Sequence, residues 1–109
     1  MSKARAKGTA AESAVVSYLQ ANGFPHAERR ALAGVNDRGD VSGLPGVVVE
    51  VKSCVRQELA AWLDEAEVER KNASASVAAV WHKRRGKGSP GAWFVTMTGE
   101  QFVNLIGES

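Results

Sequence analysis

The 109-residue chain contains a single cysteine, Cys54, and it has no internal repeat and no low-complexity tract. One thiol excludes an internal disulfide and a metal cluster built on cysteine, and we expect it to be a small core residue at the end of a strand. No apolar run approaches the roughly 20 residues of a membrane-spanning helix. No continuous apolar block follows the basic residues 1–7, so we predict no secretory signal, no membrane partner and a cytoplasmic location.

Acidic residues are missing from residues 73–90, a stretch that carries four bases, Lys83, Arg84, Arg85 and Lys87. Residues 57–72 have the opposite bias, with five acids against two bases. This sorting predicts a basic face that suits a phosphate backbone, and an acidic face that points away from DNA or toward a partner subunit. The alternative for the basic stretch is a solvated turn.

The length predicts one domain, residues 8–109, preceded by a mobile basic tail of residues 1–7. Hydrophobic periodicity predicts the order helix, three strands, helix, two strands, helix. The predicted helices cover Thr9–Asn22, Gln57–Lys71 and a last segment that begins at Thr98. The predicted strands cover His26–Leu32, Asp40–Ser42, Val47–Cys54, Ser76–Lys83 and Ala92–Met97. This order predicts an α/β fold with a mixed central β-sheet flanked by α-helices.

An acid and a base share one face of the clearest strand. Side chains alternate along a strand, so Glu50 and Lys52 point to one side while Val47, Val49 and Val51 point to the other, toward the core. If residues 44–46 form a three-residue loop with a left-handed glycine, Asp40 pairs with Glu50 across a hairpin. A two-residue loop would instead put Asp40 on the opposite face.

Two carboxylates that lie directly opposite each other in a hairpin repel and need a compensating cation. Carboxylate oxygens suit Mg²⁺ or Mn²⁺. The ion could polarise a phosphodiester and lower the pKa of a bound water. Lys52 could orient that water or stabilise the charge that develops on the phosphate. These residue types therefore indicate phosphodiester hydrolysis.

The same residues carry a family resemblance. Gly39-Asp40-Val41 followed by Glu50-Val51-Lys52 resembles the signature of PD-(D/E)XK nucleases, with Gly39 in place of the proline. Upstream, Lys7-Gly8-Thr9-Ala10-Ala11-Glu12 is similar to the opening of archaeal-type Holliday junction resolvases, and residues 36–40 resemble phage-encoded members. The resemblance covers residues 7–54, about half of the chain.

The resemblance implies a restriction-endonuclease-like fold and a homodimeric, Mg²⁺-dependent endonuclease that acts on branched DNA, in the cytoplasm of a bacterial host if the chain is phage-encoded. It implies catalytic roles for Asp40, Glu50, Lys52 and Glu12, of which the three acids would bind the metal. Together with the charge pattern, it predicts DNA contacts by basic residues: Lys7, Arg29, Arg30, Arg38, Lys83, Arg84, Arg85 and Lys87.

Other interpretations of these residues remain open. Glu50 and Lys52 could form ordinary cross-strand ion pairs. Glu12 could complete a capping box with Thr9, as Gln101 could with Thr98, and Asp37 is either a loop acid or a substitute ligand.

The function also has alternatives. The same nuclease residues could cut flaps, mismatches or plain duplex, and the chain could be a DNA-binding module without catalysis. The arginines before the motif could simply solubilise an edge strand and a loop. We expect both histidines at the surface and the three tryptophans in core or dimer packing.

Overall fold

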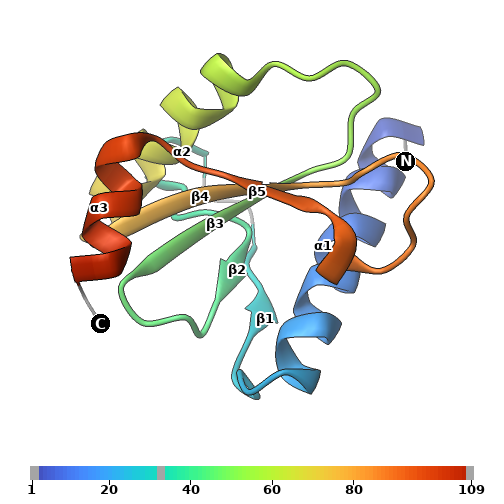
Figure 1. Cartoon of the computed structure of the whole chain (residues 1–109), viewed down its shortest axis with the longest axis horizontal. Helices are drawn as coiled ribbons and strands as arrows, with labels where there is room; N and C mark the ends of the chain where they lie inside the picture. The colour runs from blue at the N-terminus through green and yellow to red at the C-terminus, as the bar shows by residue number, and fades with distance from the viewer. Residues whose placement is uncertain (1–2, 32–33, 108–109) are drawn as a thin grey trace.

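The computed structural model describes residues 3–31 and 34–107, and it shows three α-helices and five β-strands in the predicted order (Figure 1). The helices are α1 (Lys3–Ala21), α2 (Leu59–Ala73) and α3 (Gly99–Gly107). The strands are β1 (Glu28–Arg29), β2 (Val41–Ser42), β3 (Val47–Lys52), β4 (Val77–His82) and β5 (Phe94–Thr96). Two short 3₁₀ turns, Gly34–Asn36 and Pro90–Ala92, complete the described elements.

The central sheet is mixed, with the strand order β3-β4-β5. Strands β3 and β4 run parallel, and α2 connects them, as a parallel pair requires. Strand β5 pairs antiparallel with β4, and β1 and β2 form a separate antiparallel pair. The predicted α/β class and the mixed sheet are therefore confirmed.

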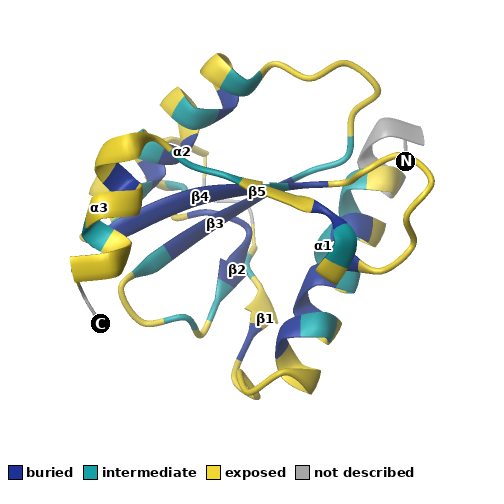
Figure 2. Ribbon diagram, viewed as in Figure 1, coloured by how far each residue is buried: buried dark blue, intermediate teal, exposed yellow. Residues whose placement is uncertain are grey.

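Helices cover both faces of this sheet (Figures 1 and 2). Val49 and Val51 of β3 pack with Val15 and Leu19 of α1. On the other face, Val48 packs in a second cluster that includes Trp62 and Ala66 of α2 and Val80 of β4. Because neighbouring residues of β3 enter different clusters, the face of Glu50 and Lys52 is the one that α2 covers.

Helix α1 begins at Lys3, so the helix starts earlier than predicted and includes Lys3–Lys7 of the predicted tail. Thr9 lies inside the helix, so its predicted role as a cap is wrong. The alanines and basic residues of this segment have high helix propensity, which explains the earlier start. Residues 1 and 2 of the predicted tail lie outside the described residues.

The predicted hairpin ladder between β2 and β3 is not formed. Gly46 does have the expected left-handed conformation, with φ +74°. Yet the Asp40 amide donates to the carbonyl of Val49, a bond that does not belong to the Asp40–Glu50 register, while the Asp40 carbonyl accepts from Arg30. Asp40 is thus held between two segments, and β2 pairs with β1 instead.

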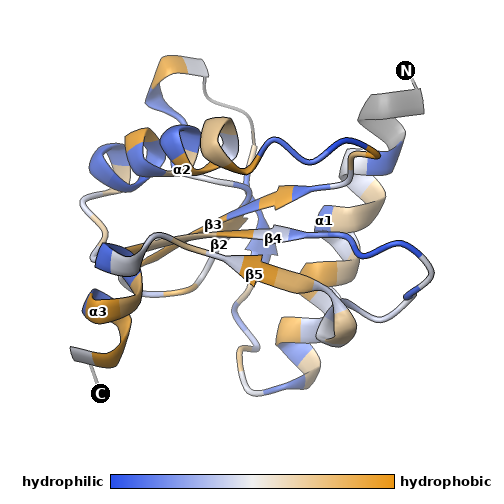
Figure 3. Ribbon diagram, turned by 45° about the horizontal axis from the view of Figure 1, so that its top comes forward, coloured by the Kyte–Doolittle hydropathy of each residue, from blue (hydrophilic) through white to orange (hydrophobic). Residues whose placement is uncertain are grey.

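The last helix buries a polar residue instead of its apolar face. Thr98 Oγ1 accepts from the Gln101 amide at 3.2 Å, as predicted for a cap. The Gln101 side chain does not complete the box but accepts from the Ala78 amide at 3.1 Å. The apolar side chains of Phe102, Leu105 and Ile106 on α3 are exposed, and Figure 3 shows this helix as hydrophobic along most of its length. No helix within the described residues has both the length and the hydropathy to cross a membrane.

Candidate functional site

The acid and the base of β3 share one face, as the alternation of the strand predicts. Lys52 Nζ lies 3.6 Å from Glu50 Oε1. Since α2 covers this face, the residue Glu50 is only 5% exposed. An ordinary exposed strand face with surface ion pairs is therefore excluded for Glu50.

Asp40 joins the strand through its carboxylate rather than through a ladder. Its Oδ2 accepts a 2.7 Å hydrogen bond from the Val51 amide, which lies between Glu50 and Lys52 in the chain. Burial raises the pKa of Asp40, whereas this hydrogen bond acts in the opposite direction. The three residues of the sequence motif are thus brought together at one strand.

Gly39, which precedes Asp40, has a backbone conformation that proline cannot adopt. Its φ is +96°, and a Cβ there would lie 2.9 Å from Val48 Cγ1 and 3.0 Å from the Val49 carbonyl oxygen. Proline fixes φ near −65° and cannot adopt this conformation. The close approach of Gly39 to β3 delivers Asp40 to its hydrogen bond.

Helix α2 adds two glutamates that the sequence prediction missed. Oxygen atoms of Glu50, Glu65 and Glu69 all lie within 4.8 Å of one another. The acidic face of this helix was expected to point away from DNA or toward a partner subunit, whereas Glu65 and Glu69 lie beside Glu50 and Lys52 of β3. The available signal was helical spacing, because Glu69 follows Trp62 and Ala66 on the side that is buried against the sheet.

Because Glu50 and Glu69 are buried, it is strongly unfavourable for both of these carboxylates to be charged at the same time. Burial, followed by the interaction with Glu69 and Asp40, raises the pKa of Glu50 to about 12. Burial also raises the pKa of Glu69 to about 7. Oε2 of Glu50 and both carboxylate oxygens of Glu69 are buried without a hydrogen-bond donor. Such a group requires protons or a cation, and its all-oxygen donor set suits a hard divalent ion.

Lys52 is the base that faces these acids. Its Nζ lies 3.3 and 3.2 Å from the two carboxylate oxygens of Glu65. Burial opposes the charged form of Lys52, but the charges of Glu50 and Glu65 outweigh it and raise the pKa of Lys52. Lys52 is therefore a fixed positive charge at the edge of the acidic group.

Glu12 lies apart from the three close glutamates. Its Oε1 accepts from Arg29 Nε at 3.3 Å. Burial, followed by the charge of Asp40, raises the pKa of Glu12. Since α1 begins before Thr9, a capping box does not account for this glutamate.

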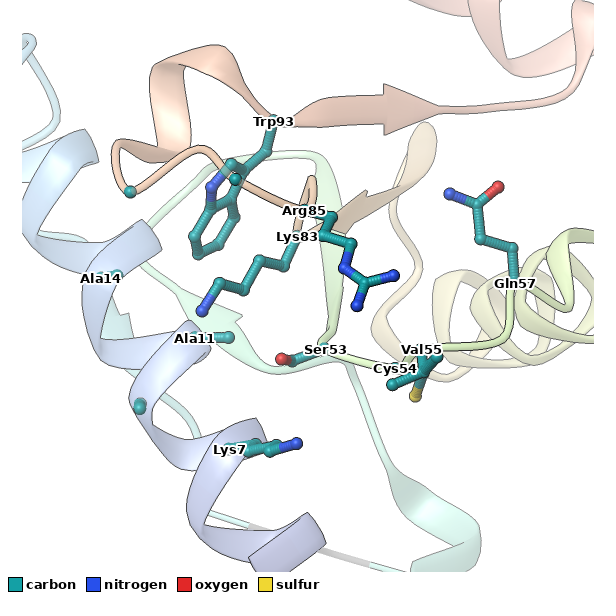
Figure 4. Close-up of a pocket in the computed structure, with 13 residues that line it drawn as sticks. Lys7, Ala11, Ala14, Ser53, Cys54, Val55, Gln57, Lys83, Arg85 and Trp93 are labelled. Atoms are coloured by element: carbon teal, nitrogen blue, oxygen red, sulfur yellow. The ribbon is translucent and has the colours of Figure 1, made fainter.

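A basic cleft opens where β3 ends (Figure 4). Lys7 of α1 and Lys83 and Arg85 of the β4–β5 loop point into this cavity of about 570 Å³. Ser53, Cys54 and Val55, the residues after Lys52, form part of its wall. Cys54 is exposed there, so its predicted place in the core is wrong.

The other predicted DNA-contacting residues lie outside the lining of this cleft. Arg84 packs over the Phe94 ring at 5.1 Å, and Lys87 is exposed on the same loop. Arg29 pairs with Glu12, Arg30 has a buried Nε, and Arg38 is exposed in the segment before Asp40.

His82 is buried, which contradicts its predicted surface position. Its Nε2 lies 2.8 Å from Thr96 Oγ1, and its ring packs against Trp62 and Phe94. Burial lowers the pKa of His82 and so favours the neutral ring. Trp62 and Trp93 are buried and Trp81 is half-buried, which agrees with a packing role for all three.

Comparison with known proteins gives no relative: no family model, no curated protein and no solved structure matches the chain.

Proposed function

We propose that the protein is a divalent-metal-dependent endonuclease that hydrolyses DNA phosphodiesters, with the four-way junction as its preferred substrate. The observation that carries this proposal is the convergence of Asp40, Glu50 and Lys52. Asp40 Oδ2 accepts a 2.7 Å hydrogen bond from the amide of Val51, which lies between the other two residues in the chain, and Lys52 Nζ lies 3.6 Å from Glu50 Oε1. Two buried acids can hold a divalent ion for phosphodiester hydrolysis, and the adjacent lysine can stabilise the charge that develops on the phosphate.

The donor groups support a metal cofactor. Glu50 and Glu69 have buried oxygens that lack a donor, and Asp40 lies beside them. A divalent ion held by Asp40 and Glu50, with Glu12 as a further acid, would supply Lewis-acid stabilisation of the phosphate and a more acidic water. Lys52 contributes its own positive charge next to the phosphate, where it stabilises the charge that develops during attack.

The basic cleft supports a polyanionic substrate. Lys7, Lys83 and Arg85 come from two separate segments and face one cavity that adjoins the motif strand. Phosphate contacts of this kind position a nucleic acid without reading its sequence. Arg84 and Lys87 are two further exposed bases on the β4–β5 loop.

The choice of a branched substrate rests on the resemblance of residues 7–54 to resolvases. That resemblance also implies a homodimer, in which two sites cut two strands. Exposed apolar side chains on α3 and β5 support an assembly, because such patches are characteristic of interaction surfaces. They include Phe94, Val95, Phe102 and Ile106.

A cleavage assay tests the proposal. A labelled four-way junction, a flap and a linear duplex are incubated with the protein in Mg²⁺, Mn²⁺ or EDTA, with Glu50→Gln and Asp64→Asn as variants. We expect paired nicks on the junction in Mg²⁺ or Mn²⁺ that EDTA and Glu50→Gln abolish and that Asp64→Asn preserves. Equal cutting of the flap or duplex would overturn the junction preference but not the nuclease. DNA binding without any cleavage would leave a binding module in place of an enzyme.

A further inference from the structure

We propose that Glu65 and Glu69 of α2 join Glu50 of β3 in a divalent-cation site, so that two of its protein ligands lie outside the sequence motif. The site deepens the proposed function, and the role of the cation in hydrolysis rests on that function. Cation binding itself rests on the geometry of the three glutamates and can be measured without DNA.

The first argument is the convergence of ligand atoms. One oxygen from each of Glu50, Glu65 and Glu69 lies within 4.8 Å of the other two, a separation that a single ion can bridge after small side-chain adjustments. Glu65 and Glu69 are four residues apart on one helix and therefore project from the same side. Glu50 faces them from the sheet.

The second argument is independent of the clustering. Glu69 is 2% exposed and Glu50 is 5% exposed, and both oxygens of Glu69 and one of Glu50 lack any hydrogen-bond donor. Buried carboxylates in proteins are paired, hydrogen-bonded or bound to a metal. Among the described residues no base and no fixed donor faces the carboxylate of Glu69, so either a proton shared with Glu50 or a cation must compensate its charge.

The third argument concerns the opening beside these residues. Glu65 and Glu69 also line a cavity of about 270 Å³, together with Asp37 and Asn72. This cavity gives a small hydrated ion a route to Glu69 and leaves room for water ligands, which Mg²⁺ and Mn²⁺ usually retain. All protein donors are oxygens, the donor type that suits Mg²⁺ and Mn²⁺.

Lys52 competes with the cation for Glu65. Both carboxylate oxygens of Glu65 lie within 3.3 Å of Lys52 Nζ. A cation bound to Glu65 replaces this ion pair and repels the ammonium group. Lys52 is then released from α2 and is available to a phosphate in the neighbouring cleft.

The test is a titration of the metal-free protein with Mn²⁺ alone, in which electron paramagnetic resonance reports unbound Mn²⁺. Wild type is compared with Glu69→Gln, with Lys52→Met and with Asp64→Asn, which removes an exposed charge from the same helix. We expect Glu69→Gln to weaken Mn²⁺ binding by about tenfold or more, and Asp64→Asn to change it by less than about twofold. We expect Lys52→Met to tighten Mn²⁺ binding, although the same variant should lose cleavage.

A thermal melt of each variant separates loss of the site from loss of the fold. Because Glu69→Gln removes a buried charge with little change in shape, we expect it to melt at or above the wild-type temperature without metal and to lose the stabilisation by Mn²⁺. Wild-type affinity in folded Glu69→Gln, or no Mn²⁺ binding by wild type, would overturn the site. Unchanged affinity in Lys52→Met would overturn the competition for Glu65. If Mn²⁺ binds as expected but DNA is not cut, the proposed function fails while the cation site stands.

Discussion

The amide of Val51 donates a 2.7 Å hydrogen bond to Oδ2 of Asp40. β3 is the edge strand of the three-stranded sheet, so its outer side offers backbone groups that no neighbouring strand of that sheet uses. Asp40 occupies this position with a carboxylate, and hydrogen bonds to a charged acceptor are stronger than those between neutral groups. The strand that carries Glu50 and Lys52 therefore also fixes the orientation of the third motif residue.

Asp40→Asn is expected to abolish cleavage without unfolding the protein. The asparagine oxygen can still accept from the Val51 amide, but the negative charge is lost, and we expect cleavage to fall by about 100-fold or more. Asp40→Leu additionally leaves a buried amide without an acceptor, which should destabilise the fold by about 1–3 kcal/mol. Cleavage rates and urea unfolding of both variants check this prediction, and full activity of Asp40→Asn would contradict it.

Gly39→Ala is expected to destabilise the protein by about 1–3 kcal/mol, because a side chain there would be strained and would contact Val48 and Val49. To relieve these contacts, the backbone at position 39 would have to shift away from β3. This shift should move Asp40 away from the Val51 amide and reduce cleavage. Gly8→Ala is the matched control, because Gly8 lies within α1 and a Cβ there has no heavy atom within 4 Å. That control should stabilise the protein by about 0.5–1 kcal/mol. Chemical denaturation of both variants measures the contrast.

Without metal, the melting temperature should fall by several degrees between pH 5 and pH 8. Burial raises the pKa of Glu69 from 4.5 to about 7, so the folded state binds its proton more tightly than the unfolded state does. The resulting stability is complete below pH 4.5 and is lost as the pH rises through about 7. Glu50, with a pKa of about 12, adds a decrease of the same sign across this interval.

Scanning calorimetry in EDTA measures this pH dependence. Glu69→Gln should have a shallower slope, although Glu50 keeps it from becoming flat. Asp64→Asn should retain the wild-type slope, since its carboxylate is exposed. A slope that Glu69→Gln leaves unchanged would show that Glu69 does not titrate in this range.

Lys83→Ala and Arg85→Ala should each weaken DNA binding. Each should also reduce the slope of the logarithm of the binding constant against the logarithm of the salt concentration by about one. Lys71→Ala removes the same charge from an exposed position on α2, away from the cleft, and should have little effect. Fluorescence anisotropy at several salt concentrations provides the measurement. The single cysteine gives a second readout, because bound DNA should protect Cys54 in the cleft from a maleimide. Full reactivity of Cys54 at saturating DNA would place the nucleic acid elsewhere.

Local patterns predict the strand that carries the site. Alternation alone places Glu50 and Lys52 on one face of β3, and three valines on the other contact the α1 side. The glycine at position 46 correctly predicts a left-handed turn. These features depend on neighbours in the chain, so the sequence contains the information that determines them.

Features that depend on long-range packing could not be predicted in the same way. The ladder between β2 and β3 does not form, because the Asp40 carbonyl accepts from the Arg30 amide while the Asp40 amide donates to the Val49 carbonyl. The length of the turn does not predict these two bonds. Glu69 is charged, and charged residues are rarely buried, so average preference puts it at the surface. Only the docking of α2 on the sheet turns this residue toward Glu50.

This docking has a consequence for folding. The glutamates from α2 and the acid from β3 meet only after the helix has crossed over the sheet to start β4. A nascent or partly opened chain, in which α2 is detached, has no three-glutamate site even if β3 is already paired with β4. If the three glutamates bind a cation as proposed, binding is therefore expected only in molecules whose crossover is complete.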